Sequence, residues 1–169
     1  MSNRPNDDPP EVGSPACYMH EADDVYMGYA GRDELVETLT GLIEAERAGT
    51  HIAIESARGA EPGAYAAFLR DLQDDEAHWC AMLAGHLRRL GATPSSKVGD
   101  FFGKAMAIAD LRERILFVNR GQGWVARKLR EILPRVRDDG LHADLAAMLR
   151  SHETNIARAN EVAGHRAPR

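Results

Sequence analysis

The sequence comprises 169 residues, of which 44% are hydrophobic and 28% charged, with a formal net charge of −5. This length predicts a single domain, and the apolar fraction excludes a wholly disordered chain. Residues 1–34 hold eight acidic and two basic side chains, so the remainder is close to neutral, and nucleic-acid binding is not expected. The sequence contains no uncharged apolar stretch of about 18 residues, so neither a transmembrane helix nor a membrane partner is expected.

The balance of residue types favours helix over sheet. The chain holds 26 alanines and 15 leucines, against 8 valines, 7 isoleucines and 5 threonines. Alanine and leucine lose little conformational freedom in a helix, whereas β-branched side chains lose more. An all-α fold is therefore expected.

The first 32 residues divide into two segments. Residues 1–15 are acidic and proline-rich, and we expect them to be a disordered tip. Because this tip contains no apolar leader, a cytoplasmic protein is expected. Residues 16–32 contain three of the four tyrosines and two of the six methionines, which predicts an ordered arm packed on the domain.

Residues 33–163 predict four amphipathic helices, because apolar residues recur at three- and four-residue steps between the prolines. The predicted helices run from Asp33 to Gly59, from Pro62 to Gly91, from Asp100 to Leu133, and from Asp139 to just before Gly164. Asp33 is the predicted N-cap of the first helix, and Pro62 the first residue of the second. Short connections indicate an antiparallel four-helix bundle, and the link of about eight residues between the second and third helices permits a crossover. Residues 164–169 are expected to be a disordered tail.

Each apolar stripe is interrupted by polar residues, which a bundle core accepts when they are paired, hydrogen-bonded or bound to a metal. These residues are Glu46, then Asp75 with His78, then Gln122, then His152 with Asn155. The intervals nearly repeat, because Glu46 and Asp75 are 29 residues apart and Gln122 and His152 are 30 apart. This shared layout of the two helix pairs indicates an internal duplication.

In these positions the chain resembles the ferritin-like, rubrerythrin-like superfamily, in which each helix pair supplies one Glu and a Glu-x-x-His to a dimetal centre. The first pair keeps this chemistry in Glu46 and in Asp75-Glu76-Ala77-His78. The second pair departs from it, with Gln122 in place of Glu and His152-Glu153-Thr154-Asn155 in place of Glu-x-x-His. The resemblance spans residues 33–163. Within it, the chain is similar to an uncharacterised bacterial ferritin-like family with a partly degenerate metal site. It implies an antiparallel ferritin-like bundle preceded by the N-terminal arm.

The resemblance implies a site for one divalent transition-metal ion, held by Glu46, Asp75, His78 and His152. Oxygen and nitrogen ligands of this kind suit iron first, with manganese and zinc as alternatives. Asp74 could replace Asp75 by an i, i+4 approach to His78.

The remaining polar residues of the helices are expected to play lesser roles. Gln122 and Asn155 would be weak ligands or hydrogen-bond partners of the imidazoles. Glu44, Glu55 and Glu76 fall off the apolar stripes and are expected to face solvent.

The residues leave two functions open. The first is a metal-binding protein, and its more specific form is a non-haem iron oxidoreductase acting on a small molecule, by analogy with iron sites built from histidine and carboxylate. The alternative is a non-catalytic structural or interaction module whose buried polar cluster holds no metal. A homodimer is expected.

The arm offers a further contribution to the site. Cys17 and His20 are three residues apart, so one helical turn would present both side chains to one end of the bundle. The alternative is that the arm only packs, because a single Cys-x-x-His pair is weak support for a metal site. A disulfide between Cys17 and Cys80 also stays open.

Overall fold

A computed structural model describes residues 25–164, and these residues form helices and no β-strand. The helices are α1 (Arg32–Arg58), α2 (Ala64–Arg89), α3 (Asp100–Met106), α4 (Leu111–Ile132) and α5 (Asp139–Gly164), with a short 3₁₀ turn at Leu133–Arg135 after α4. The predicted all-α bundle is confirmed. No helix in the described range combines the length and hydropathy needed to span a bilayer. The predicted tip, the arm up to residue 24 with Cys17 and His20, and residues 165–169 lie outside the described residues.

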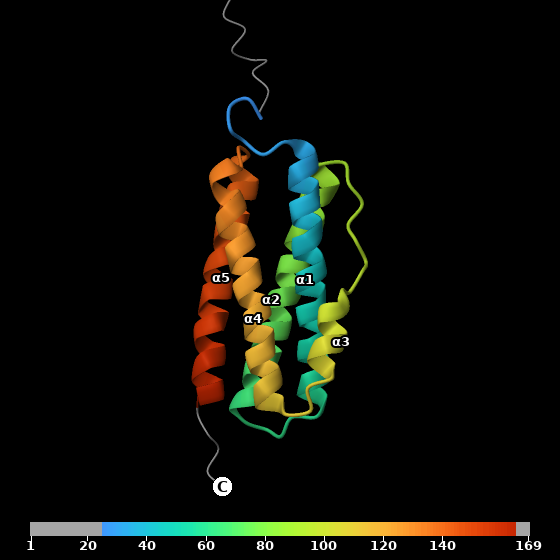
Figure 1. Ribbon diagram of the computed structural model, residues 1–169, viewed down its shortest axis with the longest axis vertical. Helices are drawn as coiled ribbons and strands as arrows, with labels where there is room; N and C mark the ends of the chain where they lie inside the picture. Colours follow the sequence, from blue (N-terminus) through green and yellow to red (C-terminus); the bar gives the residue numbers. More distant parts are fainter. Residues whose placement is uncertain (1–24, 165–169) are drawn as a thin grey trace, which may run out of the picture.

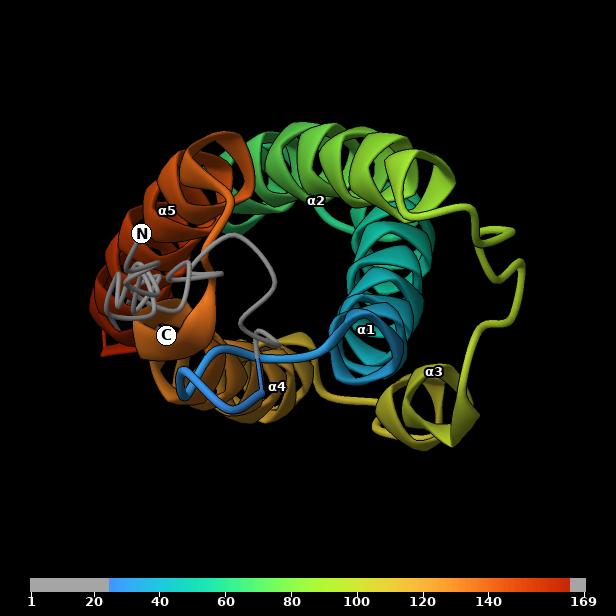
Figure 2. The same ribbon diagram turned by 90° about the horizontal axis from the view of Figure 1, so that it is seen from above.

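The four long helices form a closed bundle in the spatial order α1, α2, α5, α4 (Figures 1 and 2). Helices α1 and α2 form one antiparallel pair, and α4 and α5 form the other. The connection from α2 to α4 runs back along the outside of the bundle and carries the short helix α3, which packs on α1 (Figure 2). One long crossover of this kind is typical of ferritin-like bundles.

The third predicted helix is divided in the structure. Its apolar pattern continues from residue 100 to residue 133, but the chain leaves the helix after Met106 and restarts at Leu111. Asp110 makes the restart possible, because its carboxylate accepts a hydrogen bond from the Glu113 backbone N–H at 2.8 Å. The Arg114 guanidinium donates to the carbonyl oxygen of Ile108 at 2.7 and 2.9 Å, which satisfies a carbonyl released by the break.

The predicted helix starts also differ slightly from the observed ones. Gly31 occupies the N-cap position of α1, and the predicted cap Asp33 lies in the first turn instead. Pro62 precedes α2, which begins at Ala64 after Gly63. Acidic residues in a first turn still favour the positive end of the helix dipole, so Asp33 stabilises α1 without capping it.

The buried apolar side chains fall into two clusters stacked along the bundle axis. The cluster nearer the start of α1 includes Leu42, Leu83, Leu129, Leu145 and Met148. The second cluster includes Ile52, Leu72, Ile115, Val118 and Ala159. On every long helix, at least one buried polar residue lies between the two clusters, so a polar layer divides the hydrophobic core at one level.

A candidate metal centre in the polar layer

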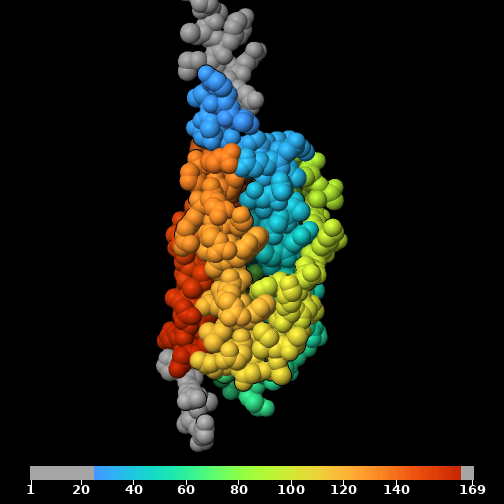
Figure 3. Space-filling model, in the orientation of Figure 1, coloured from blue at the N-terminus to red at the C-terminus, as the bar shows by residue number. Residues whose placement is uncertain are grey.

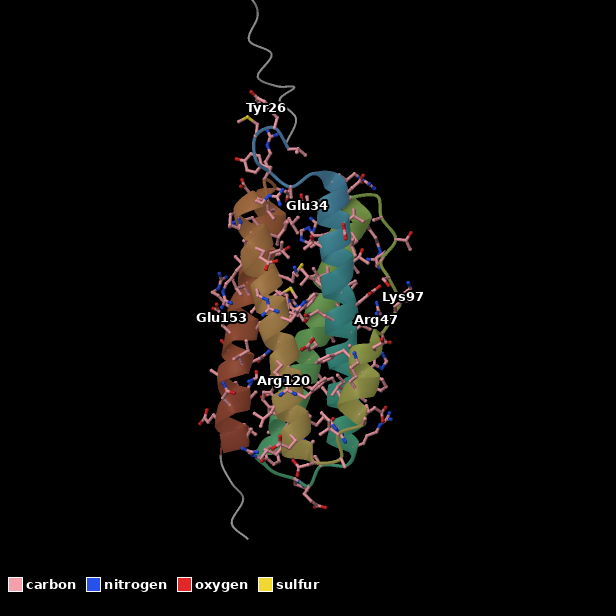
Figure 4. All side chains as sticks on the ribbon, viewed as in Figure 1. Tyr26, Glu34, Arg47, Lys97, Arg120 and Glu153 are labelled. Atoms are coloured by element: carbon pink, nitrogen blue, oxygen red, sulfur yellow. The ribbon has the colours of Figure 1, made fainter. Side chains whose placement is uncertain are left out.

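One polar side chain from each long helix enters this layer. They are Glu46 of α1, Glu76 of α2, Gln122 of α4 and His152 of α5, with 0%, 1%, 5% and 1% of their surface exposed. Glu46, Glu76 and His152 each place one possible ligand atom so that all three atoms lie within 4.8 Å of one another. Figure 4 labels Arg47 and Glu153, the chain neighbours of Glu46 and His152, in the middle part of the bundle. The layer therefore brings two carboxylates and one imidazole together away from solvent.

The imidazole of His152 is held in one orientation. Its Nδ1 lies 3.0 Å from the carbonyl oxygen of Met148, and because a carbonyl only accepts, Nδ1 must donate. In the neutral ring, Nε2 then carries the lone pair, and Nε2 lies 3.1 Å from Oε1 of Glu46. Metal-binding histidines are commonly oriented in this way by a carbonyl on the second ring nitrogen.

Two oxygen atoms of the layer have no hydrogen-bond partner within residues 25–164. Gln122 donates a hydrogen bond from Nε2 to Oε1 of Glu76, but Oε1 of Gln122 and Oε2 of Glu46 are buried and unsatisfied. A buried acceptor without a donor costs about 1–3 kcal/mol. A cation bound between these groups would satisfy both oxygens, so the donor set fits a metal ion.

The raised pKa values of the two buried carboxyl groups also favour a bound cation. Burial raises the pKa of Glu46 to about 8, and the nearby charge of Asp75 adds to this effect, while the interaction with the adjacent Glu76 carboxyl group opposes it. Burial and the adjacent carboxylate of Glu46 raise the pKa of Glu76 well above its ordinary value. Two buried carboxyl groups in contact hold protons unless a positive charge replaces them, and a bound cation reverses this preference.

A glycine of α1 makes room for the carboxyl group of Glu76. A Cβ atom at Gly49 would lie 2.6 Å from Cδ and 2.6 Å from Oε2 of Glu76. The Glu76 side chain thus lies across the backbone of α1, where a larger residue would displace it. The carboxylate reaches the layer because position 49 has no side chain.

The structure corrects the predicted set on α2. Glu76, which was expected to face solvent, is buried in the layer, whereas His78 is exposed and contacts Trp79 edge-on with ring centroids 4.5 Å apart. Asp75 is half-buried and lies outside the cluster of three ligand atoms. Asp74, the alternative to Asp75, is exposed.

Asp75 and Asn155 instead connect α2 with α5. Oδ2 of Asp75 accepts hydrogen bonds from Nδ2 of Asn155 at 2.7 Å and from Oγ of Ser151 at 2.6 Å. Asn155 is buried, as the sequence predicted, but its amide binds a carboxylate and not an imidazole. This contact fixes the two helices next to the layer without supplying a ligand to it.

The prediction for α2 was displaced by one residue, from Glu76 to Asp75. The intervals between the polar residues in the sequence indicate the correct position. Glu46 and Glu76 are 30 residues apart, which equals the interval between Gln122 and His152. Trp79 then matches Asn155, since each follows its partner by three residues and both are buried. With Glu76 in place of Asp75, the intervals in the two helix pairs are equal.

Comparisons with known proteins identify the family of the chain and support its fold. The model of a protein family described as a domain of unknown function, DUF6306, matches residues 33–161. Among solved structures, the chain is similar to a ferritin-like, diiron-carboxylate protein from Bacillus anthracis strain Ames, with a TM-score of 0.68 and 17% sequence identity over 77% of this chain and 95% of that chain. No curated protein matches the chain. The ferritin-like fold that the sequence predicted is confirmed.

Proposed function

We propose that this chain, which belongs to the DUF6306 family, binds one divalent transition-metal ion through Glu46, Glu76 and His152. The observation that carries the proposal is the meeting of these three ligand atoms within 4.8 Å in a fully buried layer. Carboxylate oxygens of Glu46 and Glu76 and Nε2 of His152 are the ligand atoms, and Oε1 of Gln122 is available as a fourth. Two carboxylates neutralise the charge of one divalent cation.

The side chains favour one ion over two. A dimetal centre draws one Glu from each of two helices and a Glu-x-x-His from each of the other two. Here α4 supplies Gln122 and α5 supplies His152 and Asn155, so the second helix pair brings no carboxylate into the layer. Oxygen and imidazole ligands without thiolate suit Fe(II), Mn(II) or Zn(II), and iron is the metal we propose first.

The more specific function that we propose is that of a non-haem iron oxidoreductase acting on a small molecule. Bound iron would supply the redox chemistry. Glu46 and Glu76 would hold the ion, while the hydrogen bond from Nδ1 of His152 to Met148 keeps the imidazole in the ligating orientation. Support for a small-molecule substrate comes from a cavity of about 400 Å³ whose lining includes Glu46, Glu76 and Gln122.

A non-catalytic module is the second candidate, and one observation favours it. The hydrogen bonds between Glu46 and His152 and between Glu76 and Gln122 satisfy part of the layer without a metal. Under this reading the polar residues would fix the packing register of the bundle. The two candidates differ in whether the purified protein takes up metal.

The test is elemental analysis of full-length protein purified without chelators and loaded anaerobically with Fe(II). We expect about one equivalent of iron per chain, because the layer offers one cluster of ligands. Replacing Glu76 or His152 with alanine should remove most of this iron. His78→Ala and His142→Ala are matched controls, because both histidines are exposed on the same two helices, and both variants should retain it.

The controls also decide whether α2 binds the metal through Glu76 or through His78. If His78→Ala loses the metal and Glu76→Ala keeps it, the ligand set proposed here is wrong. If the unmodified protein takes up less than about a tenth of an equivalent of any transition metal, the non-catalytic module is the correct function.

A further inference from the structure

A cavity connects the polar layer to the surface between α1 and α4. Its lining includes the buried Glu46, Glu76 and Gln122 together with exposed residues of α4, Arg120 and Trp124. Figure 3 shows this face of the molecule, with a hollow where the atoms of α1, α4 and α3 meet. The volume of about 400 Å³ lies toward the lower end of the range for small-molecule sites, roughly 300–1,000 Å³. The cavity therefore suits a compact ligand.

Small and aromatic side chains give the cavity its shape. Ala45, Ala48 and Gly49 line the α1 side, where larger residues would fill the space. Phe101 of α3 lies against Gly121 of α4, where a Cβ atom would be 2.6 Å from the end of the phenyl ring. This contact holds the crossover helix in place as one wall of the cavity.

The rest of the wall is apolar and partly aromatic. Val118, Val125 and Phe101 line the cavity, and Trp124 does so with 37% of its surface exposed. Aromatic side chains at the edge of a pocket present a rigid apolar face to a ligand. These residues favour a ligand with an apolar or aromatic body.

Arg120 is the cation of this cavity, and no counter-ion for it lies among the residues that the structure describes. It lies on α4 (Figure 4), is exposed, and stacks on the ring of Phe117 at 5.1 Å. Its guanidinium forms no hydrogen bond or ion pair with another residue of the range 25–164, whereas Arg130 on the same helix pairs with Glu153. The acid of the cavity wall, Glu44, is engaged elsewhere, because it accepts a hydrogen bond from Ser95 of the crossover.

We propose that the cavity binds a compact organic carboxylate, whose carboxylate pairs with Arg120 and whose apolar body lies between Trp124, Phe101 and Val118. The guanidinium matches a carboxylate with two parallel hydrogen bonds, which an exposed arginine without a partner is free to form. The far end of such a ligand points toward Glu46 and Glu76. Its role as a substrate rests on the proposed metal centre, but its binding does not require the metal.

The experiment uses 4-phenylbutyrate and the uncharged 4-phenylbutan-1-ol as probes, measured by isothermal titration calorimetry on the full chain with and without bound Zn(II). We expect the carboxylate to bind saturably, and Arg120→Gln to weaken it about tenfold, which is the effect of losing one charged hydrogen-bonding partner. The same variant should leave the binding of the alcohol unchanged. Arg127→Gln is the matched control, because Arg127 is exposed on α4 and does not line the cavity.

A second variant tests the cavity independently of charge. Ala45→Leu adds a side chain to the α1 wall and should abolish binding of both probes, while circular dichroism and zinc content on the same samples show that the bundle is intact. The proposal is overturned if the carboxylate does not bind saturably, or if Arg120→Gln or Ala45→Leu leaves its binding unchanged. Carboxylate binding by protein that takes up no metal would refute the metal centre alone, and one equivalent of zinc without carboxylate binding would refute the ligand site alone.

Discussion

At the scale of single residues, the contact between Gly49 and Glu76 predicts a variant that loses metal affinity but keeps its stability. In Gly49→Ala the new Cβ would lie 2.6 Å from the Glu76 carboxyl group, so that flexible group must shift from its position in the layer. We expect metal affinity to fall by about 10–100-fold, as when a residue that orients a ligand is lost. The free energy of unfolding should change little, because alanine adds up to about 1 kcal/mol of helix stability that offsets the displacement.

Gly85→Ala is the control for this prediction. A Cβ atom at Gly85 in α2 meets no atom within 4 Å, so this variant should gain up to about 1 kcal/mol and keep its metal. Isothermal titration with Zn(II) and urea denaturation measure the two quantities separately. Equal metal affinity in the two glycine variants would show that Glu76 is not a ligand.

The raised pKa of Glu46 predicts how the stability of the metal-free protein depends on pH. Its pKa is about 8 in the folded chain, against an ordinary value of 4.5 for a solvated glutamate, so between these values the folded state keeps a proton that the unfolded state has released. Stability should therefore fall as pH rises from 5 to 8, by about 1.4 kcal/mol per pH unit for this group. Urea denaturation of chelator-treated protein at several pH values measures the slope.

Glu46→Gln provides the comparison, because glutamine has no proton to release. The variant should lose the contribution of Glu46 to the slope and be more stable than the unmodified protein at pH 8. A stability that is level or rises with pH in chelator-treated protein would contradict the burial of two adjacent carboxyl groups.

Much of the site was predictable residue by residue. Glu46, Gln122, His152 and Asn155 are buried as the apolar stripes predicted. The stripes did not distinguish Asp75 from Glu76, because two consecutive acids differ by only 100° around a helix and an apolar face is wider than that. The arrangement of the hydrogen bonds between helices also lies beyond the sequence, since it depends on how α2 and α5 face each other.

At the scale of elements, the division between α3 and α4 is what the apolar pattern failed to predict. The pattern continues through residues 107–109 because these three residues are also apolar, and periodicity alone does not show where a helix stops. The N-cap hydrogen bond of Asp110 and the contact of Arg114 with Ile108 stabilise the break. Both depend on side chains that reach back over the turn.

Asp110→Ala tests the role of this cap. Without the carboxylate, the Glu113 backbone N–H loses its partner, and the free energy of unfolding should fall by about 1 kcal/mol. Asp110→Asn should retain most of the stability, because the amide oxygen accepts the same hydrogen bond. Thermal denaturation of both variants provides the measurement, and an equal loss in the two would show that charge, not capping, stabilises the start of α4.

At the scale of the whole molecule, the bundle consists of two hydrophobic clusters with a polar layer between them. The clusters provide the apolar burial that stabilises the fold, and the layer opposes it with two buried carboxyl groups and two unsatisfied oxygens. The helices and their antiparallel pairing were predictable from periodicity and short connections. The path of the crossover was not, because the packing of α3 on α1 depends on contacts such as that of Phe101 with Gly121.

The most direct test of the metal centre is anomalous diffraction from crystals of the iron-loaded protein, measured on both sides of the iron absorption edge. We expect one strong peak per chain, within coordination distance of carboxylate oxygens of Glu46 and Glu76 and of Nε2 of His152. A peak bound to His78 or to exposed carboxylates, or no peak in the polar layer, would contradict it.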